Sequence, residues 1–219
     1  MKIKNKFGFE KGYTDYDALL SDKDVEAVYI PLPNQLHYEW VMKAIEAGKN
    51  VLCEKPLAPT AAQVEELFEA AERKGVLLME AFAYLHTPYI AALKDEVNNK
   101  TFGDVRYIEA AFLTSDYNLT NIRMQKDCYG GATYDLGCYC TSIILRMLDR
   151  EPVTVQGVAE YSEQNVDVLT TVNVLQNYRL EVEQFGRCIT DGEKPHVSRE
   201  FSAMNARTLD KVLAAIEYN

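Results

Sequence analysis

The segment VEAVYIPLPNQLHYEWVMKAIEAGKNVLCEKPLA, residues 25–58, determines the fold class that we expect for this chain. Its apolar runs at 25–30 and 50–53 are bounded by turn or breaker residues, which is typical of strands buried on both faces. Between them, the apolar spacing predicts a helix over 36–47 that ends at Gly48, a residue favoured just after helix C-termini. The segment therefore predicts a strand, a helix and a second strand.

The same alternation continues along the next part of the chain. A capping box formed by Thr60 and Gln63 begins a second helix, which ends at Gly75. The residues of this helix expected to face inward are Val64, Leu67, Phe68 and Ala71. A third apolar run, VLLMEA at 76–81, reads as another buried strand. Short connections between such elements predict parallel strands joined by right-handed crossovers.

The pattern changes after Phe82. The remaining elements expected from the sequence are a short helix at 88–97, an antiparallel strand at 105–114, a polar loop at 115–130, a helix after Gly130-Gly131, strands at 152–161 and 166–175, and helices at 179–190 and 199–217, the last capped by Ser198. We therefore expect an α/β fold in which a parallel sheet is followed by an α+β portion.

Composition excludes several classes of protein. The 219 residues are 47% hydrophobic and carry a formal net charge of -10, so we expect no nucleic-acid partner. The basic N-terminal residues precede no apolar run, and no segment approaches the roughly 18 apolar residues of a membrane span. Five irregularly spaced cysteines do not resemble a disulfide framework. A reduced, cytoplasmic setting without a membrane partner is the expectation.

The strand ends are where a ligand is expected, because ligands of an open parallel sheet bind outside the carboxyl ends of its strands. These ends carry Pro31-Leu32-Pro33-Asn34, Glu54-Lys55-Pro56 and Glu80-Ala81-Phe82. Topology alone therefore directs Lys55 toward a crevice. The alternative is that Lys55 is an ordinary solvated charge in a loop.

A second group of candidate residues follows the glycine pair Gly130-Gly131. Asp135 and Tyr139 are four residues apart, so on a helix they share one face. A carboxylate and a phenol near a lysine form a plausible set for proton transfer, since a nearby ammonium favours the phenolate. Alternatively, Asp135 caps the helix and Tyr139 packs in the core.

The remaining cysteines and histidines are weaker candidates. Cys138 and Cys140 lack the spacing of zinc ligands and Cys128 has no nearby histidine, so structural roles are expected and no metal site is predicted. His37 and His86 are isolated histidines, which usually serve packing or hydrogen bonding.

Three motifs carry a family resemblance: the opening segment 25–58, LLMEAFAYLHTP at 77–88 and YGGATYDLGCYC at 129–140. From about Phe7 to Ile216 the chain resembles the Gfo/Idh/MocA family of NAD(P)-dependent oxidoreductases, within it most clearly the dihydrodiol and D-xylose dehydrogenase branch. The resemblance implies a partial Rossmann-like dinucleotide-binding domain at 1–83. It also implies a truncated substrate and oligomerisation domain, with a mainly antiparallel sheet, at 84–219.

The resemblance also implies roles for individual residues. Lys55 corresponds to the catalytic lysine, with a cis bond before Pro56, and Asp135 and Tyr139 correspond to the family's Asp-x-x-x-His/Tyr pair. Residues expected to line the cofactor groove are Pro31, Leu32, Asn34, His37, Glu54, Lys55 and Pro56. The implied reaction is hydride transfer between NAD or NADP and a secondary alcohol of a sugar, polyol or diol. A homo-oligomer formed through the C-terminal sheet is also implied.

The sequence departs from the family pattern in three places. It contains no G-x-G-x-x-G turn, strands are expected to be missing near 174–178, and position 85 is Leu where that branch has Arg. These departures leave open the alternative of a non-catalytic family remnant that serves as a binding or self-association module. A sugar-binding regulatory module is a third, minor alternative.

Overall fold

The computed structural model describes residues 2–105, 108–114, 118–149, 151–152, 155, 157–168 and 178–215. Two short helices, α1 (Lys2–Phe7) and α2 (Tyr16–Ser21), precede the first strand. Within these ranges, no helix has both the length and the apolar character needed to cross a bilayer.

A three-stranded parallel sheet forms as the sequence predicts. Its strands are β1 (Ala27–Ile30), β2 (Asn50–Glu54) and β3 (Leu78–Ala81), in the order β1-β2-β3. Because all three strands run in one direction, their carboxyl ends lie along one edge of the sheet. β1 and β3 each begin two residues later than the apolar runs do.

The two crossover helices also follow the sequence closely. α3 (Asn34–Glu46) begins directly after Pro33, two residues earlier than predicted. α4 (Ala61–Lys74) is capped as the capping box requires, because Thr60 Oγ1 accepts a hydrogen bond from the Gln63 N–H at 3.3 Å. Gly75 ends α4 with a φ of 67°, in the left-handed region that favours glycine.

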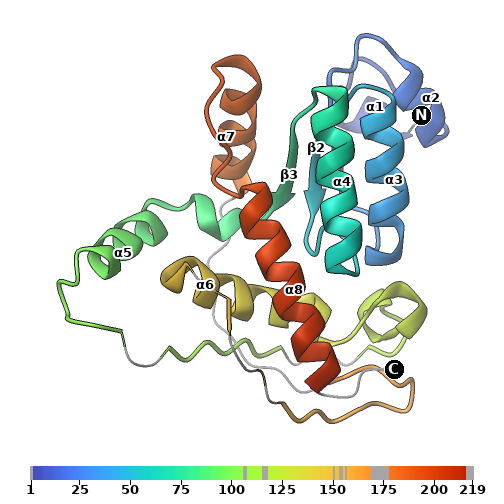
Figure 1. The fold of residues 1–219 in the computed structure, drawn as a ribbon. Coiled ribbons are helices and arrows are strands. Elements are labelled where there is room, and N and C mark those ends of the chain that lie inside the picture. Colours follow the sequence, from blue (N-terminus) through green and yellow to red (C-terminus); the bar gives the residue numbers. More distant parts are fainter. Residues whose placement is uncertain are drawn as a thin grey trace.

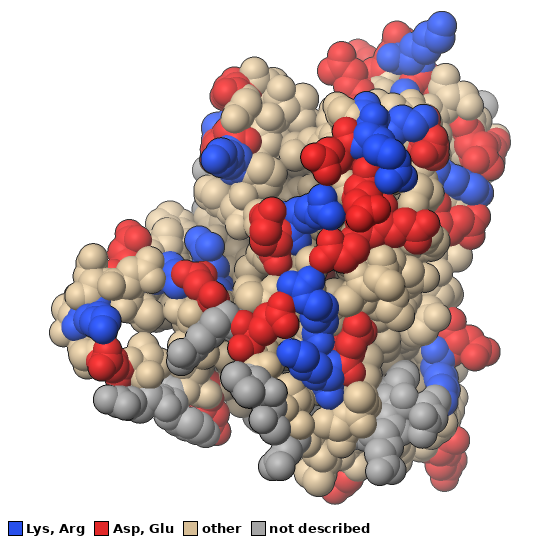
Figure 2. All heavy atoms as spheres, viewed as in Figure 1, with Lys and Arg blue, Asp and Glu red and all other residues tan. Residues whose placement is uncertain are grey.

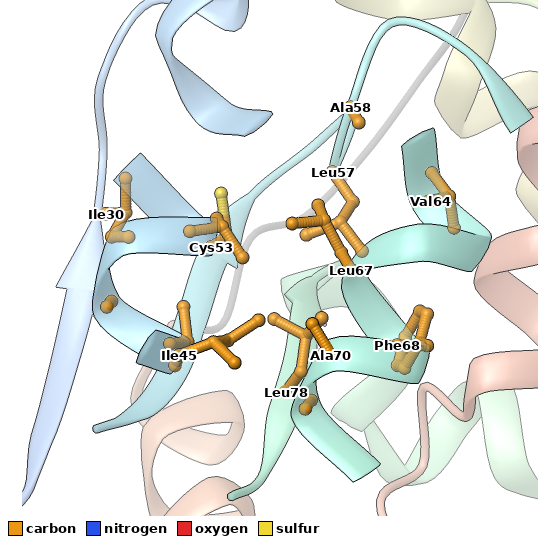
Figure 3. Close-up of a cluster of buried hydrophobic side chains, with 14 of the residues drawn as sticks. Ile30, Ile45, Cys53, Leu57, Ala58, Val64, Leu67, Phe68, Ala70 and Leu78 are labelled. Atoms are coloured by element: carbon orange, nitrogen blue, oxygen red, sulfur yellow. The ribbon is translucent and has the colours of Figure 1, made fainter. Parts of the chain in front are cut away.

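The core beneath these helices is a cluster of buried hydrophobic side chains (Figure 3). Strand residues such as Val51 and Cys53 pack against Ile45 of α3 and Leu67 of α4, and all four are 0% exposed. This packing holds α3 and α4 side by side on one face of the sheet (Figure 1). The Cys53 thiol is buried within this core.

The second half of the described chain is mostly helical. Its elements are η1 (Ala83–His86), α5 (Pro88–Asn98), η2 (Ile122–Met124), η3 (Lys126–Cys128), the π-helical turn η4 (Thr133–Gly137), α6 (Cys138–Leu148), α7 (Tyr178–Thr190) and α8 (Arg199–Ala215). The helices near 88, 138, 179 and 199 agree with the sequence prediction. Ser198 caps α8, because its Oγ accepts from the Phe201 N–H at 3.2 Å.

The second sheet is the main difference from the sequence prediction. The described residues of 105–114 form no strand, and 157–168 contribute only an isolated antiparallel bridge between Tyr161 and Asp167. Most of the predicted strand at 166–175 lies outside the described residues. An alternating pattern needs a paired neighbour to become a strand, and a lone pair of strands is marginal in water.

Helix α8 joins the two halves of the molecule. It packs against α4 and α6, and two of its residues, Ala203 and Ala206, belong to the core cluster of the sheet. Arg207 reaches Glu65 of α4 at 3.0 Å and Glu151 at 2.6 Å. Figure 2 shows the resulting alternation of basic and acidic side chains over this face. The paired side chains are 34–40% exposed, so solvent weakens these ion pairs and each contributes little to stability.

The packing of this core predicts how much stability is lost when Leu67 is truncated. Leu67→Ala removes a side chain that is 0% exposed and should lower the free energy of unfolding by about 3 kcal/mol, because it leaves a cavity. Leu113→Ala is the matched control, since Leu113 is 73% exposed and its truncation should cost less than about 0.5 kcal/mol. Urea denaturation followed by circular dichroism measures both. Equal losses in the two variants would contradict the assigned core.

Candidate active site

A cavity of about 760 Å³ lies at the carboxyl ends of β1 and β2. The other wall comes from the segments around Phe112, 121–130 and 135–139. The residues that line it are Tyr29, Pro31, Leu32, Pro33, Asn34, Glu54, Lys55, Phe112, Thr114, Asn121, Ile122, Arg123, Met124, Cys128, Gly130, Asp135, Leu136 and Tyr139. The structure therefore brings both groups of sequence-predicted candidates into one cavity.

Lys55 enters this cavity from the end of β2. The peptide bond between Lys55 and Pro56 is cis, as the family resemblance implies. The Lys55 side chain is 11% exposed, and its Nζ donates to the backbone carbonyl of Asp135 at 2.5 Å and to Asp135 Oδ1 at 3.2 Å. A solvated loop charge would show neither this burial nor these contacts.

Asp135 lies between two cations. Its Oδ1 faces Lys55, and its Oδ2 is 2.9 Å from Nε of Arg123, whose side chain is 58% exposed. Nothing in the sequence singles out Arg123, because it belongs to a polar loop with no periodic pattern. The three side chains form an ion-pair group that runs from the buried lysine to the cavity mouth.

The turn that carries Asp135 is a π-helix rather than the regular helix predicted, and such turns are frequent at functional sites. Its beginning is held by Asp167, whose Oδ2 accepts from both the N–H and the hydroxyl of Thr133 at 2.7 Å. Gly131 lies so close to Asp167 that a Cβ there would stand 2.1 Å from Oδ1. Sequence reasoning missed Asp167, which follows Gly131 by 36 residues.

Tyr139 presents its ring to Lys55 at one side of the cavity. Lys55 Nζ is 4.8 Å from the ring centroid, which is a cation–π distance. Phe112 stacks on the ring at 5.7 Å, and Phe82 meets it edge-on at 5.6 Å. These aromatic contacts fix the plane of the phenol next to the ammonium group.

The electrostatics of the site keep Lys55 protonated. Burial disfavours its ammonium form, but the carboxylates of Asp135 and Glu54 favour it, and the pKa of Lys55 is raised. Burial raises the pKa of the Cys138 thiol to about 12, so this cysteine is a neutral packing group at pH 7. Lys55 can therefore donate a hydrogen bond to a substrate oxygen but does not act as a base at neutral pH.

The residues predicted to line the cofactor groove divide into two groups. Pro31, Leu32, Asn34, Glu54 and Lys55 do line the cavity, whereas His37 and Pro56 are not among its lining residues. Asn34 Nδ2 donates to the Tyr129 carbonyl at 2.8 Å and so links the two walls.

His37 is fully buried beneath the strand ends rather than in the groove. Its Nδ1 is 2.7 Å from the Pro56 carbonyl and its Nε2 is 2.7 Å from the Leu32 carbonyl. Burial lowers the pKa of His37, so the neutral ring donates to one of these carbonyls at a time. The structure places His37 in a bridging position between two strand ends, and its contact with the cofactor stays a prediction.

Two other positions singled out from the sequence lie away from the cavity. Leu85 is 5% exposed in a second apolar cluster, and the ring of His86 stacks on His196 at a centroid distance of 5.4 Å. Across the described part of the chain, no three His, Cys, Asp or Glu side chains are grouped so that they could hold a metal ion.

The parallel sheet, the cavity at its carboxyl edge and the lysine within it place this chain among the α/β proteins whose ligand site lies at that edge. Residues 1–82 match the family model described as "Oxidoreductase family, NAD-binding Rossmann fold", and residues 90–183 match the "GFO/IDH/MocA C-terminal domain". The chain belongs to the GFO/IDH/MocA oxidoreductase family.

Individual relatives agree with this assignment. D-xylose 1-dehydrogenase (NADP(+)) 2 from Haloferax volcanii is 30% identical, and the match covers 98% of this chain and 85% of that protein. The dTDP-3,4-didehydro-2,6-dideoxy-alpha-D-glucose 3-reductase of Actinomadura kijaniata is 42% identical over 81% of this chain. A crystal structure of a 3-ketoreductase from Actinomadura kijaniata with NADP and TDP-benzene superposes with a TM-score of 0.83 at 27% identity, covering 98% of this chain and 85% of that one.

The matched lengths differ among the relatives. The chain spans 85% of the xylose dehydrogenase, but only 53% of the Actinomadura 3-reductase and 50% of the dihydrodiol dehydrogenase from Xenopus laevis. The chain therefore covers about half the length of several curated relatives.

The close approach of Gly131 to Asp167 makes a prediction. Gly131→Ala should lower the free energy of unfolding clearly more than Gly192→Ala. The new Cβ at position 131 would clash with Asp167, whereas the one at position 192 would have no neighbour within 4 Å. Both glycines have positive φ, 106° and 69°, so Gly192→Ala measures the backbone strain alone, about 1–2 kcal/mol. Chemical denaturation of the two variants provides the comparison. Equal losses would show that Asp167 does not hold the turn.

Proposed function

We propose that this chain transfers a hydride between NAD or NADP and a secondary alcohol of a sugar, polyol or diol. The observation that carries the proposal is the convergence of Lys55, Asp135 and Tyr139 in one cavity at the carboxyl edge of a parallel sheet. Ligand sites of such sheets lie at this edge. The relatives named above, a xylose dehydrogenase and nucleotide-sugar reductases, support a sugar-like substrate.

The residues present fit the nicotinamide end of a dinucleotide. Pro31, Leu32, Asn34 and Glu54, which line the cavity together with Lys55, would hold this end of the cofactor. The sequence contains no G-x-G-x-x-G turn, so none of its residues is assigned to the pyrophosphate. When bound, the nicotinamide supplies or accepts the hydride.

The roles of the three side chains follow from their contacts. The Lys55 ammonium, held by Asp135, would donate a hydrogen bond to the substrate oxygen and stabilise negative charge that develops there. Tyr139, beside that ammonium, would exchange a proton with the same oxygen through its hydroxyl. Asp135 would orient Lys55 and keep it charged. Arg123 would hold the second oxygen of Asp135.

Three further features belong to the same proposal. The boundary between a dinucleotide-binding region, 1–83, and a substrate region, 84–219, is proposed at the end of β3.

Self-association through the second region is proposed from the family resemblance, and light scattering tests it. A cytoplasmic location is proposed because all five cysteines are free thiols.

Binding of the cofactor is the first test. Titration of the protein into NADH or NADPH should give a saturable change in nicotinamide fluorescence with at least one of them. The absence of a saturable change with both would remove the oxidoreductase proposal for this chain and favour a non-catalytic binding module instead.

Side-chain replacements test the assigned chemistry. Tyr139→Phe and Lys55→Met should lower kcat with a sugar substrate by about 10²- to 10⁴-fold, because each removes a group that acts on the reacting oxygen. Lys43→Met and Tyr89→Phe change residues of the same types that do not line the cavity, and they should retain activity. Steady-state rates followed at the nicotinamide absorbance measure the effect. Full activity in Tyr139→Phe would exclude Tyr139 as the proton-transfer group.

A further inference from the structure

Glu80 is a buried carboxylate that no step of the proposed reaction uses. It lies in β3, in register with Cys53 of β2, and is 2% exposed. Its Oε1 accepts a hydrogen bond from the backbone N–H of Leu57 at 2.9 Å. Leu57 follows the cis bond between Lys55 and Pro56 directly, so Glu80 contacts the same turn that aims Lys55.

The turn is held from two sides. His37 of α3 meets the Pro56 carbonyl at 2.7 Å, and Glu80 of β3 takes the N–H of the next residue. These two contacts come from different elements and engage adjacent peptide groups. Together they leave the backbone on the C-terminal side of Lys55 little freedom to rotate.

The second oxygen of Glu80 has an unusual environment. Oε2 of Glu80 and Oγ of Ser202, a residue of α8, are both buried, and the Ser202 hydroxyl interacts with the carboxylate and lowers its pKa. Ionising a carboxylate at so buried a position is costly, and the Leu57 N–H and the Ser202 hydroxyl offset part of that cost.

We propose that Glu80 is a positioning residue for Lys55, which acts through the Leu57 N–H to fix the turn after β2. This inference rests on the proposed function, because it assigns Glu80 to the same site. Glu80 does not touch substrate or cofactor, and it is not among the residues that line the cavity.

The charge of Glu80 should tune this contact near neutral pH. Burial raises the pKa of Glu80 to about 7, while the Ser202 hydroxyl, the Leu57 N–H and the Lys55 ammonium lower it and Glu54 raises it. The other titratable groups that face it are the thiols of Cys53 and Cys138, and burial keeps both neutral. The ionised carboxylate accepts the Leu57 bond more strongly and attracts Lys55, so the turn is held best above pH 7.

Two variants separate the hydrogen bond from the charge. Glu80→Gln keeps an oxygen acceptor for the Leu57 N–H but cannot ionise, whereas Glu80→Ala removes the acceptor. Glu69→Gln is the matched control, because the Glu69 side chain is 58% exposed. We expect Glu80→Ala to lower kcat by about 10- to 100-fold with KM changed less than about threefold. Glu80→Gln should restore most of kcat and lose the change in kcat that wild type shows near pH 7.

Amide hydrogen exchange at Leu57 measures how firmly the turn after β2 is held, and it requires no catalytic activity. The Leu57 amide should exchange at least about tenfold faster in Glu80→Ala than in wild type or Glu80→Gln, since its acceptor is lost. The Val51 amide, bonded to the Leu77 carbonyl at 2.7 Å within the sheet, serves as the internal reference and should not change.

The pH dependence of thermal unfolding provides an independent test of the raised pKa of Glu80. A carboxyl whose pKa is raised on folding destabilises the native state as pH rises from its unfolded pKa toward about 7. The Tm of Glu80→Gln minus that of wild type should therefore increase between about pH 4.5 and 7 and then level off.

The outcomes distinguish the two proposals. If no cofactor binds, the proposed function fails, while the exchange of the Leu57 amide still decides whether Glu80 fixes the turn. An unchanged Leu57 amide in Glu80→Ala, or wild-type kcat in that variant where turnover is measured, would overturn the positioning role. A parallel increase in exchange at Leu57 and Val51 would show general destabilisation and would also overturn it.

Discussion

The contact between Lys55 and Asp135 is the constraint on which the rest of the site depends. The two residues are 80 positions apart, yet the lysine Nζ engages both the backbone carbonyl and a carboxylate oxygen of Asp135. Both side chains are largely buried, so the pair must offset the loss of hydration with well-formed contacts. The ion pair can position the Lys55 ammonium only if the backbone at both Lys55 and Asp135 is held rigidly.

Each end of that pair has its own support. On the lysine side, the cis bond at Pro56, the buried ring of His37 and the carboxyl of Glu80 restrict the turn after β2. On the aspartate side, Asp167 holds the start of the π-helical turn against Gly131. Helix α8 connects these supports, since it packs on α4 and α6 and places Ser202 opposite Glu80. Helix α8, although it lies late in the chain, therefore supports a cavity whose lining residues all lie between Tyr29 and Tyr139.

The parallel unit was predictable because its signals are local. Apolar runs of strand length, the Thr60 cap and glycines such as Gly75 report backbone conformation within a few residues. The strand at 105–114 was predicted by the same logic and does not form in its described residues, because a strand depends on a partner that local sequence does not reveal. The position of Lys55 at the carboxyl edge of the sheet followed from topology alone, before any contact was known.

The supporting residues were not predictable in this way. Arg123 lies in an aperiodic loop, Asp167 is distant in sequence from the turn it holds, and Glu80 looks like one polar residue in an apolar strand. His37 was assigned to the groove by resemblance, whereas the fold buries it between two carbonyls. Each of these roles exists only once distant segments have packed together.

By itself, the sequence determined the parallel α/β unit, the edge at which Lys55 emerges and the membership of an oxidoreductase family, because periodicity, caps and motifs are properties of short segments. Only the tertiary structure decided which groups hold Lys55 and Asp135 in place. Those contacts join elements far apart in the chain, and their energies depend on burial and geometry that no short segment contains.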